Sequence, residues 1–256
     1  MKQLLDGKKI IVAGAAGLLG KALVKGALAQ GAQVIATDIK VNAMRTIFAD
    51  IALDLDPQKL LFDEIDVTDE ESISACFRRH QGVNGAVNCS YPRNKSYGSK
   101  FLDVSMIDFN ENLALQLGSA FAFMKNCVSI FGEQELPFSL VNISSIYGVV
   151  APKFEIYKGT DMTTPVEYAA IKSAIIHLTK YATSFVNNSD FRVNCVSPGG
   201  LLDNQPSEFC DKYKSNTLGV GMLDAEDIVG AVMFLWSDQA KYVNGQNIIV
   251  DDGFSL

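Results

Sequence analysis

Short runs of apolar residues alternate along this chain with longer segments in which apolar residues recur at helical spacing. The apolar runs predict seven strands, at Lys9–Ala13, Gln33–Thr37, Leu60–Ile65, Gly85–Asn88, Phe138–Ile143, Arg192–Val196 and Asn247–Val250. The longer segments predict helices at Leu18–Gln30, Glu70–Arg79, Met106–Phe131, Val166–Val186 and Ala225–Trp236. Strands separated by about ten or more helical residues pair in parallel, because a parallel return requires a crossover. The pattern predicts one doubly wound α/β domain of the Rossmann type over residues 1–256, with helices on both faces of a seven-stranded parallel sheet.

Two long segments, 151–165 and 199–222, do not follow this alternation. Both contain proline and many polar residues, and neither has a clear period. Loops this long in a compact domain usually carry function. We expect both to contact a small-molecule substrate, with plain surface insertions as the alternative.

Composition and charge exclude several classes of protein. The chain has 22 Lys and Arg against 29 Asp and Glu and no basic stripe, which argues against a nucleic-acid-binding protein. It shows no signal-peptide pattern and no uninterrupted apolar run of about 20 residues, so we expect no membrane span. Its five scattered cysteines are typical of free thiols in the cytoplasm. With two histidines in the chain, we expect neither a metal site nor a Ser-His-Asp triad.

A glycine-rich turn follows the first predicted strand and precedes the first helix. Its sequence is Gly14-Ala-Ala-Gly17-Leu-Leu-Gly20. Glycines let the backbone approach a diphosphate, and the helix N-terminus supplies unpaired N–H groups. Glycines also occur in ordinary turns between a strand and a helix. The predicted cofactor contacts here are Gly14, Ala16, Gly17, Leu18 and Leu19.

Asp38 closes the second predicted strand, where its carboxylate would accept a hydrogen bond from a ribose 2′-hydroxyl and repel a 2′-phosphate. Because no Lys or Arg lies within the turn, we predict NAD in preference to NADP, with Lys40 as the reservation. The alternative for Asp38 is a turn residue at the end of a strand. Further predicted contacts lie at the ends of the third and fourth strands, where helix caps or loop entries are the alternative: Asp66, Val67, Asn88 and Ser90.

Tyr168 and Lys172 lie four residues apart in a strongly helical segment, and therefore on one face of a helix. A free phenol has a pKa of about 10, which a nearby ammonium and a positive nicotinamide would lower toward neutrality. Ser145 follows the fifth predicted strand and would hydrogen-bond the reacting oxygen, although a turn cap is the alternative. A second Tyr-x-x-x-Lys, from Tyr91 to Lys95, lies in a polar stretch. We interpret it as a coincidence, or at most as loop residues near the cofactor.

Together these pieces resemble the short-chain dehydrogenase/reductase family over nearly the whole chain. The resemblance rests on the glycine turn, Asp66-Val67, Asn88, Ser145, Tyr168 with Lys172, Arg192–Gly199 and Gly245–Gly253. It implies that Ser145, Tyr168 and Lys172 are catalytic. It also implies that Pro198 and Gly199 flank the nicotinamide, with Leu201 as a further cofactor contact. The implied strand order is 3-2-1-4-5-6-7, and the implied assembly is a dimer or tetramer.

Three segments are more narrowly similar to the flagellin-modification oxidoreductases of bacterial sialic-acid-like (nonulosonate) sugar pathways. They are Asn88–Asn94, Ser144–Gly159 and Pro198–Pro206. This similarity implies an amino-sugar or sugar-phosphate substrate in flagellin glycan biosynthesis.

The chain departs from the family pattern at three places. Its glycines have the Gly-x-x-Gly-x-x-Gly spacing of longer nucleotide-sugar-modifying relatives, and segment 151–165 is an insertion between Ser145 and Tyr168. The helix asparagine of the family's proton relay corresponds in phase to Gln116, and Asn112 lies one turn earlier. Either amide can fill that role, and the sequence leaves the choice open.

The hypothesis that follows is an NAD-dependent oxidoreductase that interconverts a secondary alcohol and a ketone on a small polar substrate. A nucleotide-sugar epimerase or dehydratase with tightly bound NAD is the second reading, supported by the glycine spacing. A catalytically inactive NAD-binding regulator is the third, supported by the altered asparagine position.

Overall fold

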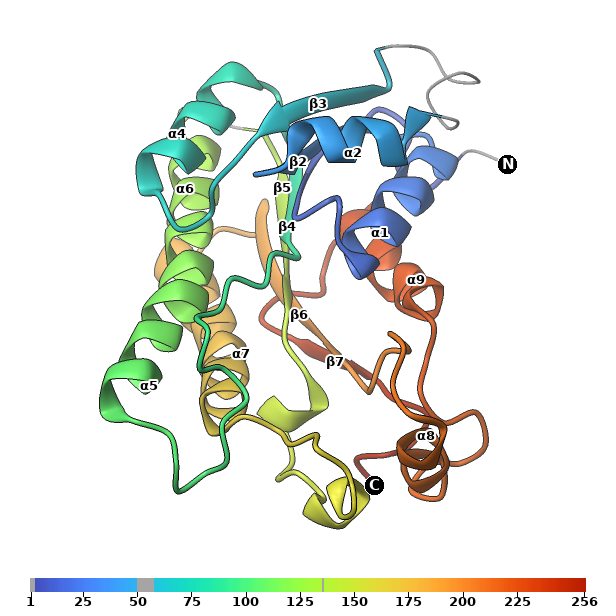
Figure 1. Cartoon of the computed structure of the whole chain (residues 1–256). Helices are drawn as coiled ribbons and strands as arrows, with labels where there is room; N and C mark the ends of the chain where they lie inside the picture. The colour runs from blue at the N-terminus through green and yellow to red at the C-terminus, as the bar shows by residue number, and fades with distance from the viewer. Residues whose placement is uncertain (1–2, 50–57, 135) are drawn as a thin grey trace.

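The protein forms a parallel sheet between two layers of helices (Figure 1). The structure is a computed structural model that describes residues 3–49, 58–134 and 136–256. Within these residues, seven strands pair in parallel in the order β3-β2-β1-β4-β5-β6-β7. Their bounds are β1 Lys9–Ala13, β2 Gln33–Asp38, β3 Leu60–Glu64, β4 Gly85–Asn88, β5 Phe138–Ile143, β6 Phe191–Pro198 and β7 Asn247–Val250. The predicted α/β fold and the strand order implied by the resemblance are confirmed.

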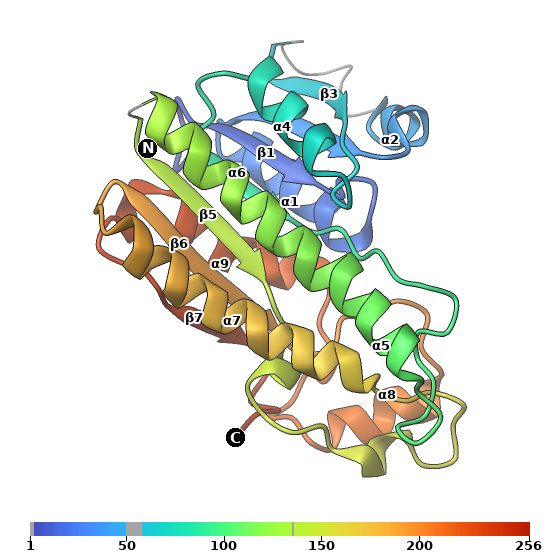
Figure 2. The same ribbon diagram turned by 90° about the vertical axis from the view of Figure 1, so that its left-hand side faces the viewer.

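Helices cover both faces of this sheet. The α-helices of the described residues are α1 Leu18–Ala29, α2 Val41–Ile47, α4 Glu70–Arg79, α5 Met106–Asn112, α6 Ser119–Gln134, α7 Val166–Val186, α8 Ser207–Lys214 and α9 Ala225–Trp236. Helices α1 and α9 lie on one face, and α4, α6 and α7 lie on the other (Figures 1 and 2). Strand β1 shows why both layers are needed. Its buried Ile10 and Val12 join the core cluster of α1 and α9, whereas Ile11 and Ala13 join the cluster of α4 and α6, because alternate residues of a strand point to opposite faces.

Two short helices lie where the sequence pattern predicted none. Helix α2 buries only Met44, and α8, inside segment 199–222, buries only Phe209 and Tyr213. One or two buried positions are too few to give a readable helical period. Tertiary contacts stabilise α8, since Phe209 and Tyr213 pack with Ile156 and Phe254 from distant parts of the chain.

The predicted helix Met106–Phe131 is interrupted in the structure. Between α5 and α6 the residues Leu113–Gly118 form a π-helical turn, a rare conformation that often occurs at functional sites. By length and composition alone, Met106–Gln134 could span a membrane. Inside the fold, however, Phe123, Cys127 and Ile130 of this stretch pack into the core beneath the sheet.

Candidate active site

The glycine turn after β1 packs closely against the end of β4. Gly14 has a φ of +77°, and a Cβ atom there would lie 2.7 Å from the Ser90 backbone nitrogen. Helix α1 begins after Gly17, which serves as N-cap, and no side chain caps this helix end. The first N–H groups of α1 therefore face the carboxyl edge of the sheet without a side-chain partner. This cradle fits the diphosphate of a dinucleotide.

Asp38 lies beside this turn. Its carboxylate accepts hydrogen bonds from the backbone N–H of Ala16, at 3.2 Å, and of Lys40, at 3.0 Å. The two bonds hold the carboxylate next to the glycines, where a ribose hydroxyl would reach it. The same bonds also serve the local turn, so the geometry is compatible with both interpretations of this residue.

The predicted residues after β3 and β4 behave differently from one another. Asp66 accepts hydrogen bonds from the Thr68 N–H, at 2.9 Å, and from the Thr68 hydroxyl, at 2.7 Å, which makes it a local turn residue. The Val67 side chain is buried in the core, so only its backbone can face a cofactor. Asn88 instead lines the cavity described next, and its Oδ1 accepts a hydrogen bond from the Ser90 N–H.

A cavity of about 410 Å³ opens at the carboxyl edge of the sheet. The predicted site residues that line it are Leu18, Leu19, Asn88, Ser90, Ser145, Tyr168, Lys172, Pro198, Gly199 and Leu201. Gly14, Ala16 and Gly17 form the adjoining turn, and Asp38 lies beside it. Four predicted residues lie outside the cavity lining: Asp66, Val67, Asn112 and Gln116. The fold thus brings residues from six separate segments of the chain to one edge of the sheet.

Tyr168, Lys172 and Ser145 meet in this cavity. The Lys172 Nζ lies 5.5 Å from the centroid of the Tyr168 ring and donates a hydrogen bond of 3.0 Å to the Ile143 carbonyl. The Ser145 hydroxyl lies close enough to the Tyr168 phenol to lower the pKa of that phenol. A close contact fixes this arrangement, because a Cβ on Gly148 would lie 2.7 Å from the Lys172 backbone carbon. The turn after β5 can therefore approach α7 at this point only through a glycine.

Burial dominates the titration of both catalytic candidates. It raises the pKa of Tyr168, while the nearby Ser145 hydroxyl acts in the opposite direction. Burial also lowers the pKa of Lys172 to about 8. The predicted lowering of the phenol pKa by Lys172 is therefore wrong for the protein without cofactor, because burial outweighs it and the pKa of Tyr168 rises.

Both irregular segments form walls of the cavity. Segment 151–165 contributes Tyr157, Met162, Thr163, Thr164 and Pro165, and segment 199–222 contributes Asp203, Gln205, Phe209, Tyr213 and Met222. The Tyr157 hydroxyl lies 3.0 Å from that of Tyr147 and accepts a hydrogen bond of 2.5 Å from Thr164. Sequence reasoning did not single out these side chains, since the conformation of an irregular loop has no period to read. Their one sequence signal is the cluster of tyrosines and threonines between residues 147 and 164.

The two candidate relay amides face a neighbouring loop. Asn112 accepts a hydrogen bond from the Asn94 N–H and donates to the side chains of Asn94 and Glu167, each at 3.1 Å. Gln116 lies on the π-helical turn, with its buried amide near the Tyr97 hydroxyl and without a hydrogen-bond partner among the described residues. Within the described ranges, no hydrogen bond joins either amide to Lys172.

One group of possible metal ligands, Asp63, Cys76 and His80, lies away from the cavity. The Asp63 carboxylate already accepts hydrogen bonds of 2.8 Å from both Arg79 and His80. Burial raises the pKa of the Cys76 thiol to about 12, so it is not a ready thiolate ligand. The contacts of Asp63 with Arg79 and His80 explain why these side chains lie together.

Comparison with known proteins relates the whole chain to oxidoreductases. A family model described as enoyl-(acyl carrier protein) reductase matches residues 14–255. Post-translational flagellin modification protein A of Campylobacter coli is 38% identical over 258 residues, which cover 99% of this chain and 100% of that protein. Short-chain dehydrogenase reductase 4 of Arabidopsis thaliana is 28% identical over 269 residues, covering 100% of this chain and 85% of that protein.

Solved structures share the same architecture. A short chain dehydrogenase from Leptospira borgpetersenii with bound NAD+ superimposes with a TM-score of 0.84 at 29% identity, covering 99% of this chain and 94% of that one. A gluconate 5-dehydrogenase from Burkholderia cenocepacia, in complex with NADP and tartrate, has a TM-score of 0.85 at 20% identity, covering 99% and 97%. At that identity the second likeness shows the fold alone. Because these proteins carry different dinucleotides, the preference of this chain has to be argued from its own residues.

Proposed function

Because the chain belongs to the short-chain dehydrogenase/reductase family, we propose that it is an NAD-dependent oxidoreductase that interconverts a secondary alcohol and a ketone. The observation that carries this proposal is the meeting of Ser145, Tyr168 and Lys172 in one cavity beside the glycine turn. A hydroxyl, a phenol and an ammonium in this arrangement can orient a substrate oxygen and exchange its proton.

Each residue has a distinct role in the proposed reaction. The nicotinamide cofactor, when bound, supplies the acceptor or donor of the hydride. Ser145 hydrogen-bonds the substrate oxygen and holds it near Tyr168. Tyr168 accepts the proton of the alcohol during oxidation and returns it during reduction. Lys172, held on the Ile143 carbonyl, presents a positive charge next to the phenol and favours its ionised form.

The preference for NAD rests on Asp38. Its carboxylate is held at the glycine turn by the Ala16 N–H, and a 2′-phosphate placed there would meet like charge. Lys40, just before α2, and Arg45, on α2, line a neighbouring hollow of the surface, and they are the cations that could offset this repulsion. We give Asp38 the larger weight because it directly adjoins the turn.

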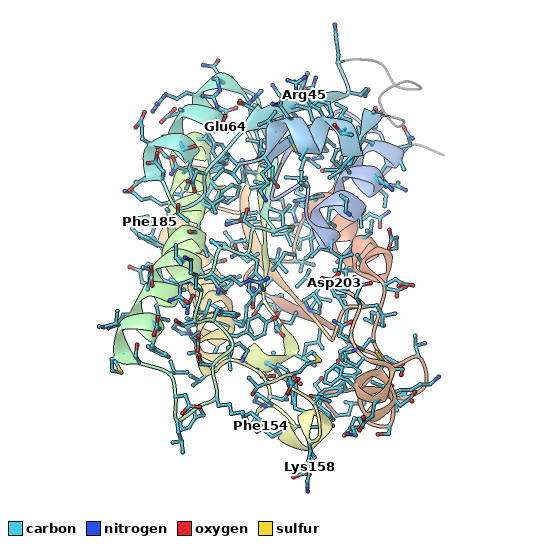
Figure 3. All side chains as sticks on the ribbon, viewed as in Figure 1. Arg45, Glu64, Phe154, Lys158, Phe185 and Asp203 are labelled. Atoms are coloured by element: carbon cyan, nitrogen blue, oxygen red, sulfur yellow. The ribbon has the colours of Figure 1, made fainter. Side chains whose placement is uncertain are left out.

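The cavity lining supports a polyhydroxylated substrate with an amino group. The hydroxyls of Tyr147, Tyr157 and Thr164 form one polar wall. Among the described residues, the lining carries two charged side chains, Lys172 and Asp203. Asp203, labelled in Figure 3, suits a substrate ammonium, whereas no cation besides Lys172 is available for a phosphate. An amino sugar therefore fits better than a sugar phosphate, and the flagellin-modification relative supports a place in flagellin glycan biosynthesis.

The test is a screen of amino sugars, sugar phosphates and nucleotide sugars for NADH formation from NAD. Tyr168→Phe is the matched control, because it removes one hydroxyl and keeps the ring. We expect it to lower turnover by at least about 100-fold while NAD affinity stays nearly intact. Normal turnover in this variant would reject the assignment. NAD that copurifies without net NADH formation would favour an epimerase or dehydratase, and NAD binding without any turnover would favour a regulator.

Self-association is part of the proposal. Helices α6 and α7 lie side by side on one face of the molecule (Figure 2). This face exposes large apolar side chains, with Phe121 53%, Tyr181 64% and Phe185 71% exposed. Apolar side chains gathered in this way are typical of a protein–protein interface. A second copy of the chain seated on this face would cover them. A cytoplasmic location fits the five free cysteines.

A further inference from the structure

The second Tyr-x-x-x-Lys motif does not form a helix, yet the fold places its tyrosine at the active site. Tyr91 and Lys95 lie in a non-helical stretch after β4, and Lys95 is exposed. Tyr91, however, lines the same cavity as Tyr168 and Lys172. Its ring meets that of Tyr168 edge to face, with centroids 6.0 Å apart and an interplanar angle of 86°. The motif is thus not a second catalytic pair, because its tyrosine faces the lysine of the first.

Lys172 lies against the rings of both tyrosines. Its Nζ is 5.9 Å from the centroid of Tyr91 and 5.5 Å from that of Tyr168. Both distances are within the range at which an ammonium is attracted to an aromatic face, and this attraction grows when water is excluded. The exposed Arg93 also lies over the Tyr91 ring, at 5.3 Å.

The other groups around Lys172 do little to keep it charged. The titratable groups that face it are the phenols of Tyr91 and Tyr168, the thiol of Cys89 after β4, and the thiol of Cys195 on β6. Burial raises the pKa of each thiol to about 12, so both are neutral. No carboxylate pairs with Lys172 in the described part of the chain. Besides the Ile143 carbonyl, the aromatic faces are therefore the groups that attract its charge.

Tyr91 is held in this position by a second tyrosine. Its hydroxyl hydrogen-bonds the Tyr97 hydroxyl, and the two rings meet at 89° with centroids 5.6 Å apart. The Tyr97 hydroxyl in turn lies beside the buried Gln116 amide on the π-helical turn. The π-helical turn Leu113–Gly118 thus places the Gln116 amide next to the tyrosine that holds Tyr91.

We propose that Tyr91 is a positioning residue for the proposed reaction, whose ring, held by Tyr97, keeps Lys172 in its ammonium form beside Tyr168. This inference rests on the proposed function for its purpose, but its physical content concerns the protein without substrate. It predicts that the acid dissociation constant of the Lys172 ammonium depends on the aromatic ring of Tyr91 more than on its hydroxyl.

The test is an NMR titration of the protein labelled with 13C at the lysine Cε positions, with Lys172→Arg used to assign the Lys172 signal. We expect Tyr91→Leu, which removes the ring, to increase the acid dissociation constant of the Lys172 ammonium roughly tenfold. Tyr91→Phe keeps the ring and should leave that constant nearly unchanged. Tyr97→Phe removes the hydrogen bond that holds Tyr91, and its dissociation constant for the Lys172 ammonium should lie between those of the other two variants.

An unchanged or smaller dissociation constant in Tyr91→Leu would overturn the inference, as would an equal effect of Tyr91→Phe. Should the leucine variant not fold, as judged by circular dichroism, Tyr91→Met removes the ring at the same site and decides the same question. In an active enzyme, the alkaline limb of the kcat profile should move to lower pH in the ring-less variant and should stay in place in Tyr91→Phe. If no substrate is ever turned over, the proposed function fails, whereas the titration still decides the role of Tyr91.

Discussion

Replacing Gly14 by alanine tests how tightly the glycine turn is built. An alanine at a φ of +77° is strained by about 1–2 kcal/mol, because its Cβ approaches the following carbonyl oxygen. The new Cβ would also lie 2.7 Å from the Ser90 nitrogen and 2.9 Å from the Cys89 carbonyl carbon. These are backbone atoms, so the end of β4 must shift, and overpacking of this kind costs about 1–3 kcal/mol. We expect a total loss of about 2–5 kcal/mol in the free energy of unfolding.

Gly7 offers a matched control for this substitution. Its φ is +79°, and a Cβ there would meet nothing within 4 Å, so Gly7→Ala carries the backbone strain without the crowding. We expect Gly7→Ala to lose about 1–2 kcal/mol and to bind NAD normally. Gly14→Ala should be less stable and should bind NAD more weakly, since Ser90 borders the cavity beside the proposed NAD site. Urea unfolding and calorimetric titration with NAD measure both effects. Equal stability and equal NAD affinity in the two variants would refute the close approach of the turn to β4.

Three further changes test the cofactor preference, the lysine and the interface. Asp38→Ser should raise the ratio of kcat/KM for NADP to that for NAD by at least roughly tenfold, and an unchanged ratio would remove Asp38 from the cofactor site. Burial lowers the pKa of Lys172 in the folded protein to about 8, below the ordinary lysine value of 10.5. The buried charge therefore destabilises the fold in full below pH 8, and this penalty disappears as the pH rises toward 10.5. Lys172→Met should therefore unfold at higher urea than the wild type at pH 7, with a smaller difference at pH 10; a constant difference would contradict this account. Phe185, which lies on the outer side of α7 (Figure 3), should be covered in the assembly, so Phe185→Glu should lower the mass measured by light scattering, and an unchanged mass would exclude this face as the interface.

The local periodicity of apolar residues was enough to predict much of the fold. The predicted bounds of β1, α4, β4, β5, α7, α9 and β7 agree with the structure, because each of these elements carries enough apolar positions to show its period. The glycine turn was equally readable, since a strand, three spaced glycines and a helix are adjacent in the chain. The four-residue spacing of Tyr168 and Lys172 needed only a helix to place both on one face.

Other features depend on contacts between distant segments. Segment 151–165 has one short 3₁₀ turn, Phe154–Tyr157, and Phe154 and Lys158 lie at its outer tip (Figure 3). Tyr157 and Thr164 of the same segment line the cavity. Asn112, a relay candidate by position, hydrogen-bonds the loop at Asn94. No period in the sequence encodes either outcome.

The sequence by itself determined the order of strands and helices, the glycine turn and the identity of the acid–base candidates, because these depend on residues close together in the chain. Only the tertiary structure decided which tyrosine faces Lys172, which amides are occupied elsewhere and in which direction the pKa values of Tyr168 and Lys172 move. The physical reason is that desolvation and side-chain contact depend on how segments pack together, and segments as far apart as Tyr91 and Lys172 meet only in the folded protein.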